Sequence, residues 1–346
     1  KTVLSTLKVV NNNTMGLLTV VLEKPEGYGR IVRDRKGDIC GIIEQKDAMP
    51  QELEIQEVNT GVIAISTNLL QKWLPQIGND NAQNEYYLTD LISIANKAGI
   101  KIEAVNPGTP EEVKGVNTRK QLSKLERFYQ QKQADRLMVN GATLADPSRV
   151  DIRGTIFCDV DTFIDVNTVF EGEVKLGKNV SVGPNCLITE SSIGDNVKIK
   201  ANTIIENSTI CNDVEVGPFA RVRPGTLLGD NSKIGNFVEV KNTEVGKGSK
   251  ISHLSYIGDS QLGKDVNVGA GTITCNYDGA NKNKTIIGDD SFIGSNASLV
   301  APVTIGKNAT IGAGSTITKD IPDNELSVSR SPQLNKSGWE RPKKKK

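Results

Sequence analysis

Residues 193–216 read IGDNVKIKANTIIENSTICNDVEV, and this stretch decides the fold of the larger part of the chain. An aliphatic residue returns at every fifth or sixth position, and the positions between are mostly polar, with several Asn and Asp. This period fits neither an amphipathic helix nor the two-residue alternation of a half-buried strand. It predicts a parallel β-solenoid of hexapeptide repeats, in which each coil buries its aliphatic side chains only against the neighbouring coils.

The same phase continues on both sides of this stretch. Coils begin 17 or 18 residues apart, which corresponds to three hexapeptides per coil, at Leu176, Ile193, Ile210, Leu228, Val245 and Leu262. Weaker repeats reach back to Ile152, and the last clear repeat is at Ile317. Glycine often follows the aliphatic residue, and we expect it to serve tight bends at the corners of the coils.

One insertion interrupts the period, at residues 275–285, CNYDGANKNKT. A solenoid accommodates an insertion as a loop that leaves a corner. The polar residues and glycine of this segment predict a projecting loop, and loops on rigid scaffolds often carry function.

The first part of the chain follows a different pattern. Strand-like runs at residues 17–22, 30–32, 39–43, 58–65 and 102–105 alternate with helical patterns at 68–73 and 86–98, and a longer amphipathic helix is expected over 118–139. This layout predicts an α/β domain, but it has few strands and no glycine-rich phosphate loop. We therefore expect a partial domain at residues 1–116, a linker helix at 117–140, the solenoid at 141–325 and a tail at 326–346.

Charge and composition exclude several classes of protein. Lys and Arg total 42 against 41 Asp and Glu, which argues against a nucleic-acid binder built on positive charge. The five cysteines are scattered without a CxxC motif, as is usual for reduced thiols in the cytoplasm. No apolar run approaches the ~18–20 residues that a membrane-spanning helix needs.

The chemistry-bearing residues concentrate in the middle of the solenoid. His253 is the single histidine and therefore the obvious general-base candidate, although a packed or surface histidine without a role is an equally open interpretation. Polar residues near it recur at about one-coil spacing and should stack on one face: Arg221, Arg223, Glu239, Lys241, Tyr256 and Asn267. Arg and Lys together favour a phosphate, and Glu239 could fix the histidine tautomer. A metal site is not expected in the solenoid, because one histidine is too few.

Long motifs in this region resemble a known family. They are RVRPG at 221–225, GNFVEVK at 235–241, SHLSY at 252–256 and GAGTITCNYDGANK at 269–282. The chain resembles, over nearly its whole length, the bacterial bifunctional N-acetylglucosamine-1-phosphate uridyltransferases/glucosamine-1-phosphate acetyltransferases. The resemblance implies a Rossmann-like nucleotidyltransferase domain followed by a left-handed parallel β-helix, assembled as a cytoplasmic homotrimer without membrane or nucleic-acid partners.

For the acetyltransferase half, the resemblance implies a complete site. His253 would be the catalytic base, helped by Glu239, and the sugar phosphate would be bound by Arg223, Lys241, Tyr256 and Asn267. Acetyl-CoA, the cosubstrate, would contact Ala270, Asn276, Tyr277, Lys282, Ser295, Ala313 and Arg330. The product, N-acetylglucosamine 1-phosphate, would then react with UTP to give UDP-N-acetylglucosamine for peptidoglycan and lipopolysaccharide precursors.

For the uridyltransferase half, the resemblance rests on GYGR at 27–30, on Glu44, on Asn59 and on GVN at 115–117. It implies UDP-N-acetylglucosamine contacts from Gly29, Glu44, Asn59 and Asn117, with Asn117 also holding Mg²⁺. The nucleotide loop and the aspartate that would share the metal are missing and would lie before Lys1. We therefore expect this half to be truncated here.

Two other interpretations of the solenoid remain open. A non-catalytic scaffold would not need His253 or a dense polar cluster. An acyltransferase for a different amine would differ at the phosphate contacts Arg223 and Lys241.

Overall fold

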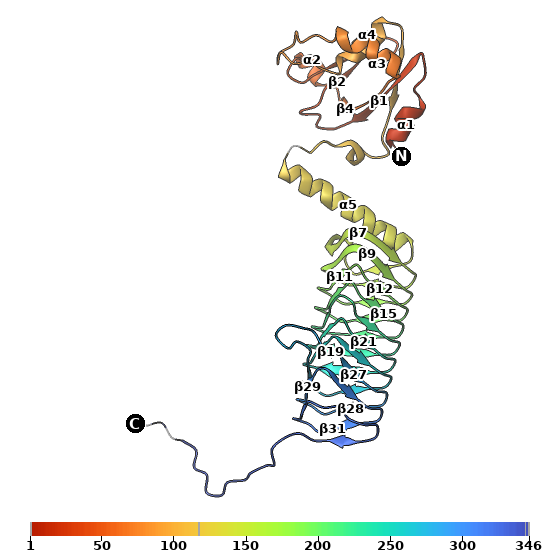
Figure 1. Cartoon of the computed structure of the whole chain (residues 1–346). Helices are drawn as coiled ribbons and strands as arrows, with labels where there is room; N and C mark the ends of the chain where they lie inside the picture. Colours follow the sequence, from red (N-terminus) through yellow and green to blue (C-terminus); the bar gives the residue numbers. More distant parts are fainter. Residues whose placement is uncertain (1, 117, 343, 345–346) are drawn as a thin grey trace. The chain divides into compact units, whose positions relative to one another are not determined.

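The computed structural model describes residues 2–116, 118–342 and 344. The chain divides into two compact units, Lys1–Glu126 and Arg127–Lys346. The first unit contains a sheet and helices, and the second contains the solenoid (Figure 1).

A mixed sheet forms the centre of the first unit, with the strand order β3-β2-β4-β1-β5. Its strands are β1 (Thr14–Val21), β2 (Arg30–Arg33), β3 (Ile39–Ile43), β4 (Glu57–Ala64) and β5 (Lys101–Val105). β1 and β5 are parallel, whereas β1–β4, β2–β4 and β2–β3 are antiparallel. All five strands were indicated by the sequence.

The helices of the described residues are α1 (Thr2–Lys8), α2 (Pro50–Leu53), α3 (Thr67–Trp73), α4 (Asp90–Lys97) and α5 (Arg119–Val139), with short 3₁₀ turns at Leu74–Gln76, Pro110–Val113 and Pro147–Arg149. Trp73 of α3 and Leu91 and Ile92 of α4 pack in one core with Met15 and Leu17 of β1. The pattern at 86–98 predicted a longer helix, but α4 begins only at Asp90. No pattern in the sequence indicated α1.

Three columns of short parallel strands form the solenoid of the second unit. The first column, with 11 strands in the described residues, contains β6 (Thr143–Leu144), β8 (Phe163–Ile164), β10 (Ser181–Val182), β13 (Lys198–Ile199), β16 (Glu215–Val216), β19 (Lys233–Asn236), β22 (Lys250–His253), β25 (Asn267–Val268), β28 (Phe292–Ile293), β31 (Thr310–Ile311) and β33 (Leu326–Ser327). The predicted parallel solenoid is thus confirmed.

The other two columns are continuous at the first coils, where β7 (Val150–Cys158) and β9 (Thr168–Leu176) each run across both. The second column continues through β11 (Leu187–Thr189), β14 (Ile204–Glu206), β17 (Arg221–Val222), β20 (Glu239–Lys241), β23 (Tyr256–Gly258), β26 (Ile273–Cys275), β29 (Ser298–Val300) and β32 (Thr316–Ile317). The third continues through β12 (Ser192–Ile193), β15 (Thr209–Ile210), β18 (Leu227–Leu228), β21 (Glu244–Val245), β24 (Ser260–Leu262), β27 (Thr285–Ile287) and β30 (Val303–Ile305).

The core of the solenoid is a thin column of the predicted repeat residues. Ile251 and Ile257 are fully buried. Thr274, which is the one polar residue at an inward position of the repeat, is only 1 % exposed. Each buried aliphatic side chain contributes on the order of 1.5–3 kcal/mol. The helix α5 closes one end of this column, where Ala134 and Leu137 join the core.

The corners are turned mainly by Asn and Asp in the left-handed region, such as Asn196, Asn202 and Asp213 with φ of 58°, 60° and 59°. These residues tolerate that conformation because their short polar side chains bond locally. The expectation that the glycine after the aliphatic residue serves the bend therefore fails at most coils, although Gly217, which follows Val216, does take a φ of 98°. A Cβ on Gly246 would lie 2.1 Å from the carbonyl oxygen of Gly263, so that glycine instead permits the close approach of neighbouring coils.

The insertion leaves the solenoid between β26 and β27 as predicted, and a bridge between Tyr277 and Lys282 closes the loop. All five cysteines, which lie in described ranges, are free. Burial raises the pKa of the Cys186 thiol to about 11. In the described residues, no helix is long and apolar enough to cross a membrane.

Candidate active site at a solenoid corner

His253 lies beside one corner of the solenoid, at the end of β22. Leu254 turns this corner with a φ of 45°, and β23 begins two residues later at Tyr256. The preceding coil repeats the arrangement, with Asn236 at the end of β19 and Phe237 in the turn at a φ of 56°. His253 and Tyr256 therefore belong to two different faces that meet at the corner.

The imidazole has a defined partner in the preceding coil. Nδ1 of His253 lies 2.7 Å from Oδ1 of Asn236, and the two residues are register partners of β19 and β22. An amide oxygen accepts hydrogen bonds but cannot donate them, so the ring donates from Nδ1. In the neutral imidazole, Nε2 is then the nitrogen without a proton, which is the form that a general base requires.

Glu239 does not contact the imidazole, although we expected it to fix the tautomer. Its carboxylate instead accepts a 2.8 Å hydrogen bond from Nη1 of Arg223. This hydrogen bond raises the pKa of the Arg223 guanidinium further above its ordinary value. The reason is the register: Glu239 is paired with Tyr256, beyond the corner, and Asn236 holds the place beside His253.

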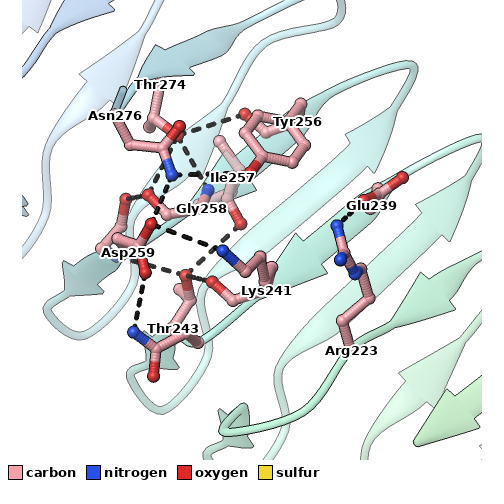
Figure 2. A network of polar contacts seen from close by, with 12 residues as sticks. Arg223, Glu239, Lys241, Thr243, Tyr256, Ile257, Gly258, Asp259, Thr274 and Asn276 are labelled. Atoms are coloured by element: carbon pink, nitrogen blue, oxygen red, sulfur yellow. Dashed lines mark hydrogen bonds and ion pairs between the residues drawn. The ribbon is translucent and has the colours of Figure 1, made fainter. Parts of the chain in front are cut away.

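Figure 2 shows the polar network on the second column, around β20 and β23. Asp259 lies at its centre, with Lys241 Nζ 3.8 Å from Oδ2. Nδ2 of Asn276 donates to the same oxygen, and Nδ2 of Asn242 donates to Oδ1 at 2.7 Å. Nδ2 of Asn276 also lies 3.5 Å from the hydroxyl of Tyr256.

Gly258 has no side chain, and this makes room for the side chains of the network. A Cβ at this position would lie 2.5 Å from the Tyr256 hydroxyl and 2.9 Å from Nδ2 of Asn276. Its backbone N–H donates to Oγ1 of Thr274 at 2.8 Å. Any side chain at this position would displace the ends of two predicted substrate-binding side chains, Tyr256 and Asn276.

The insertion loop brings a second lysine to the network. Lys241 lowers the pKa of Lys282, through a direct side-chain contact and the repulsion of two positive charges. The predicted phosphate and loop lysines thus lie together, and a phosphate is the natural counter-charge for such a pair.

Asn267 does not join this network. It lies in β25, on the first column, and its register partner is Lys250. The expectation that all the polar residues stack on one face is therefore wrong, because one-coil spacing does not distinguish the two faces beside a corner. Arg223, Lys241 and Tyr256 lie on one face, and His253 and Asn267 on the other.

Four predicted residues form a column of their own along the first face. His253, Ala270, Ser295 and Ala313 each follow the inward residue of their coil by two positions. The inward residues are Ile251, Val268, Ile293 and Ile311, and each is the register partner of the next. Arg330 bonds into the end of this column, with Nη1 donating to the carbonyl oxygen of Ala313 at 3.0 Å. Small side chains follow the imidazole, so the surface beyond it is shallow and open.

In the first unit, the structure brings together three predicted residues. The backbone N–H of Asn59 donates to the carbonyl oxygen of Gly29 at 2.9 Å. A Cβ on Gly29 would lie 3.2 Å from the Glu44 carboxylate, so these residues adjoin. Asn117, the predicted metal ligand, lies outside the described residues. Among the residues that are described, no group of three or more His, Cys, Asp and Glu could hold a metal ion.

Sequence reasoning missed two members of the site, Asn236 and Asp259. Asn236 lies one coil before His253, and Asp259 lies one coil before Asn276. The coil spacing marks both positions, but it does not show what their side chains contact. Two surface hollows of about 630 and 550 Å³ lie at earlier coils and contain none of the predicted site residues.

Comparisons with known proteins agree with this architecture. Two family models match the solenoid: the GMPPB C-terminal domain over residues 152–245 and the bacterial transferase hexapeptide (six repeats) over residues 284–319. Among solved structures, the UDP-N-acetylglucosamine acyltransferase from Campylobacter jejuni is 18 % identical, covering 55 % of this chain and 71 % of its own, with a TM-score of 0.36. The corresponding enzyme from Francisella novicida is 19 % identical over 54 % of this chain and 67 % of its own, with a TM-score of 0.29. These distant similarities do not identify a substrate for this chain.

The fold and its polar corner define a hexapeptide-repeat transferase. The bifunctional protein GlmU of Marinobacter nauticus is 55 % identical over 97 % of this chain and 74 % of its own length. GlmU of Idiomarina loihiensis is 54 % identical with the same coverage. The chain belongs to this family of bifunctional GlmU enzymes, and the resemblance stated from the sequence is confirmed.

Proposed function

We propose that this chain transfers the acetyl group of acetyl-CoA to the amine of glucosamine 1-phosphate, which gives N-acetylglucosamine 1-phosphate and CoA. The observation that carries the proposal is the imidazole of His253, held through Nδ1 by Asn236 with Nε2 left as an acceptor. It lies exposed at a corner where the predicted phosphate and acetyl-CoA residues meet from two faces.

The chemistry at His253 follows from this tautomer. The amine nitrogen attacks the thioester carbonyl carbon while Nε2 accepts the proton that nitrogen must lose. The C–S bond then breaks, and the imidazolium returns the proton to the departing CoA thiolate. General-base catalysis of this kind contributes about 10²–10⁴ in rate.

The second face would recognise the sugar phosphate. Arg223 and Lys241 supply two positive charges, and Lys282, which was expected to contact acetyl-CoA, lies against Lys241 and adds a third. Tyr256 supplies a hydroxyl over Gly258. Asn267 would approach the same sugar from the first face, because the two faces meet at the corner.

Acetyl-CoA would lie along the column after His253. Ala270, Ser295 and Ala313 keep the surface low, and Arg330 lies at the end of the column, where a positive charge suits a CoA phosphate. Asn276 and Tyr277 would contact the cosubstrate from the insertion loop.

A second and third copy of the chain would complete the cleft, in a homotrimer. The corner beside His253 carries Phe219, Phe237 and Leu254 at positive φ, and Phe237 and Leu254 are 57 % and 65 % exposed. Bulky apolar residues are unfavourable both in the left-handed region and in water. A neighbouring subunit that covers this apolar corner would account for their presence and would place its own surface beside the imidazole.

The remaining expectations from the family belong to the same proposal. The solenoid would be left-handed, and the first unit would be a Rossmann-like uridyltransferase domain that uses UTP and Mg²⁺. The adjacent Gly29, Glu44 and Asn59 would contact UDP-N-acetylglucosamine. The reactions would take place in the cytoplasm, where acetyl-CoA and UTP are available.

The experiment compares acetyl acceptors. Release of the CoA thiol from acetyl-CoA is followed with glucosamine 1-phosphate and with glucosamine. Rapid turnover of the phosphorylated sugar, with glucosamine at least a hundredfold poorer in kcat/KM, supports the proposal. Equal use of both sugars, or no turnover of either, would refute it.

A further inference from the structure

Asp259 is the most enclosed charged group of the polar network. It occupies a corner of the solenoid at a φ of 49°, and its side chain is only 12 % exposed. Lys241 and Asn276 converge on its carboxylate (Figure 2). Asn242 also donates to it, at 2.7 Å.

The carboxylate is held in its ionised form. Burial by itself would raise the pKa of Asp259. The hydrogen bonds from Asn242 and Asn276 and the positive charges of Lys241 and Lys282 outweigh that effect, so its pKa is lowered. At neutral pH, the negatively charged carboxylate of Asp259 therefore lies near Lys241, Lys282 and the side-chain amide of Asn276.

This anion fixes the orientation of Asn276. A carboxylate only accepts hydrogen bonds, so Asn276 must present Nδ2 to Asp259. Oδ1 of Asn276 is then the atom left to accept a hydrogen bond from a ligand N–H. The same carboxylate attracts the Lys241 ammonium, and the backbone N–H of Asp259 donates to the carbonyl oxygen of Lys241 at 2.9 Å.

From this geometry, and resting on the proposed function, we propose that Asp259 is a positioning residue that couples the two substrate subsites. It holds Lys241 for the sugar phosphate and Asn276 for acetyl-CoA through one shared carboxylate. Loss of its charge should therefore impair both substrates together.

The turn at this corner does not need the charge. Asn207 and Asn242 occupy the same place in earlier coils, at φ of 39° and 47°. An asparagine at 259 would turn the corner equally well, and its Oδ1 would still accept the hydrogen bond from Asn242. Asp259→Asn thus separates positioning from folding.

The control is Asp213→Asn. Asp213 also turns a corner, with a φ of 59°, and accepts a 3.1 Å hydrogen bond from Nδ2 of Asn196. It lies away from the network, so its substitution should leave acetyl transfer unchanged.

The test measures acetyl transfer, thermal unfolding and both KM values. We expect Asp259→Asn to raise KM for glucosamine 1-phosphate and for acetyl-CoA, to lower kcat/KM by about thirtyfold or more, and to retain the unfolding temperature. We also expect the double variant Lys241→Met/Asp259→Asn to be no worse for the sugar phosphate than Lys241→Met alone, because Asp259 acts there through Lys241.

Other outcomes have distinct meanings. Full activity of Asp259→Asn beside an active wild type overturns the coupling and leaves the proposed function standing. The coupling is also overturned if the effects of Lys241→Met and Asp259→Asn add up in the double variant. It is overturned as well if a lower unfolding temperature of Asp259→Asn accounts for its loss of activity. A wild type without acetyl transfer refutes the proposed function, and the coupling with it.

Discussion

Nδ1 of His253 lies 2.7 Å from the side-chain oxygen of Asn236, its register partner one coil earlier. The contact determines which ring nitrogen is free. Without it, the imidazole could rotate and take either tautomer, and only part of the population would present an unprotonated Nε2 to the amine.

Asn236→Ala should therefore lower kcat about tenfold, or about 1.4 kcal/mol in the barrier. The KM values for both substrates should stay within about twofold, since neither binding face is altered. Steady-state kinetics of CoA release measures this split, with Lys198→Ala, an exposed residue of β13 on the same column, as the control. An unchanged kcat would show that Asn236 does not orient the base.

Arg223 should act on the sugar phosphate alone. Arg223→Ala is expected to raise KM for glucosamine 1-phosphate at least tenfold and to leave KM for acetyl-CoA unchanged. The Arg223–Glu239 pair is about one-third exposed on each side, so its loss should change the free energy of unfolding by less than about 1 kcal/mol.

Urea unfolding checks the second part of that prediction. Equal increases in both KM values, or a large loss of stability, would assign Arg223 a structural role. Glu239→Gln serves as the partner variant, because it removes the same ion pair and keeps the guanidinium.

Gly258→Ala should displace Tyr256 and Asn276. The added methyl would meet the Tyr256 hydroxyl at 2.5 Å and the Asn276 amide at 2.9 Å, which forces both side chains to move. We expect kcat/KM to fall about tenfold or more for both substrates. Gly78→Ala, where a Cβ meets nothing within 4 Å, is the control and should have no effect on acetyl transfer.

The sequence predicted the solenoid well because every inward position of the repeat reports the same physical requirement, burial of one aliphatic side chain. Even Thr274 follows the phase and is buried. The projecting loop was predictable for the same reason, since it alone breaks a regular period. The first unit was harder: its helix α4 begins at Asp90, four residues later than the apolar spacing suggested.

The site was predicted as a set of residues but not as a geometry. Coil spacing placed Glu239 near His253, yet the corner at Leu254 separates them onto two faces. Asp259 was missed because asparagine and aspartate turn most corners of this solenoid, and Asn236 was missed because it resembles the many other polar residues beside the corners. Only the structure distinguishes these two residues, by what their side chains contact.

Phe237 tests the proposed assembly. Phe237→Asn replaces an exposed aromatic residue at positive φ by the residue that commonly turns such corners, so the coil itself should lose little stability. Its stacking on Phe219, with ring centroids 5.4 Å apart, would be lost. If a second subunit covers this corner, the variant should dissociate and lose acetyl transfer.

Sedimentation gives the result directly. The wild type should sediment at about three times the 37.3 kDa of one chain, and Phe237→Asn should shift toward the single chain. Asn202→Gly, at the same corner two coils earlier, should remain assembled. A fully active wild-type monomer would refute the shared cleft.

The central claim is that His253 is the base for acetyl transfer, and the most direct measurement is kcat for CoA release with glucosamine 1-phosphate in His253→Ala beside the wild type. The substitution removes Nε2 and leaves both binding faces in place. The account predicts a decrease of about 10²-fold or more, which is at least about 2.7 kcal/mol, with unchanged acetyl-CoA affinity and unchanged assembly. A variant that assembles normally and keeps most of its turnover would contradict it.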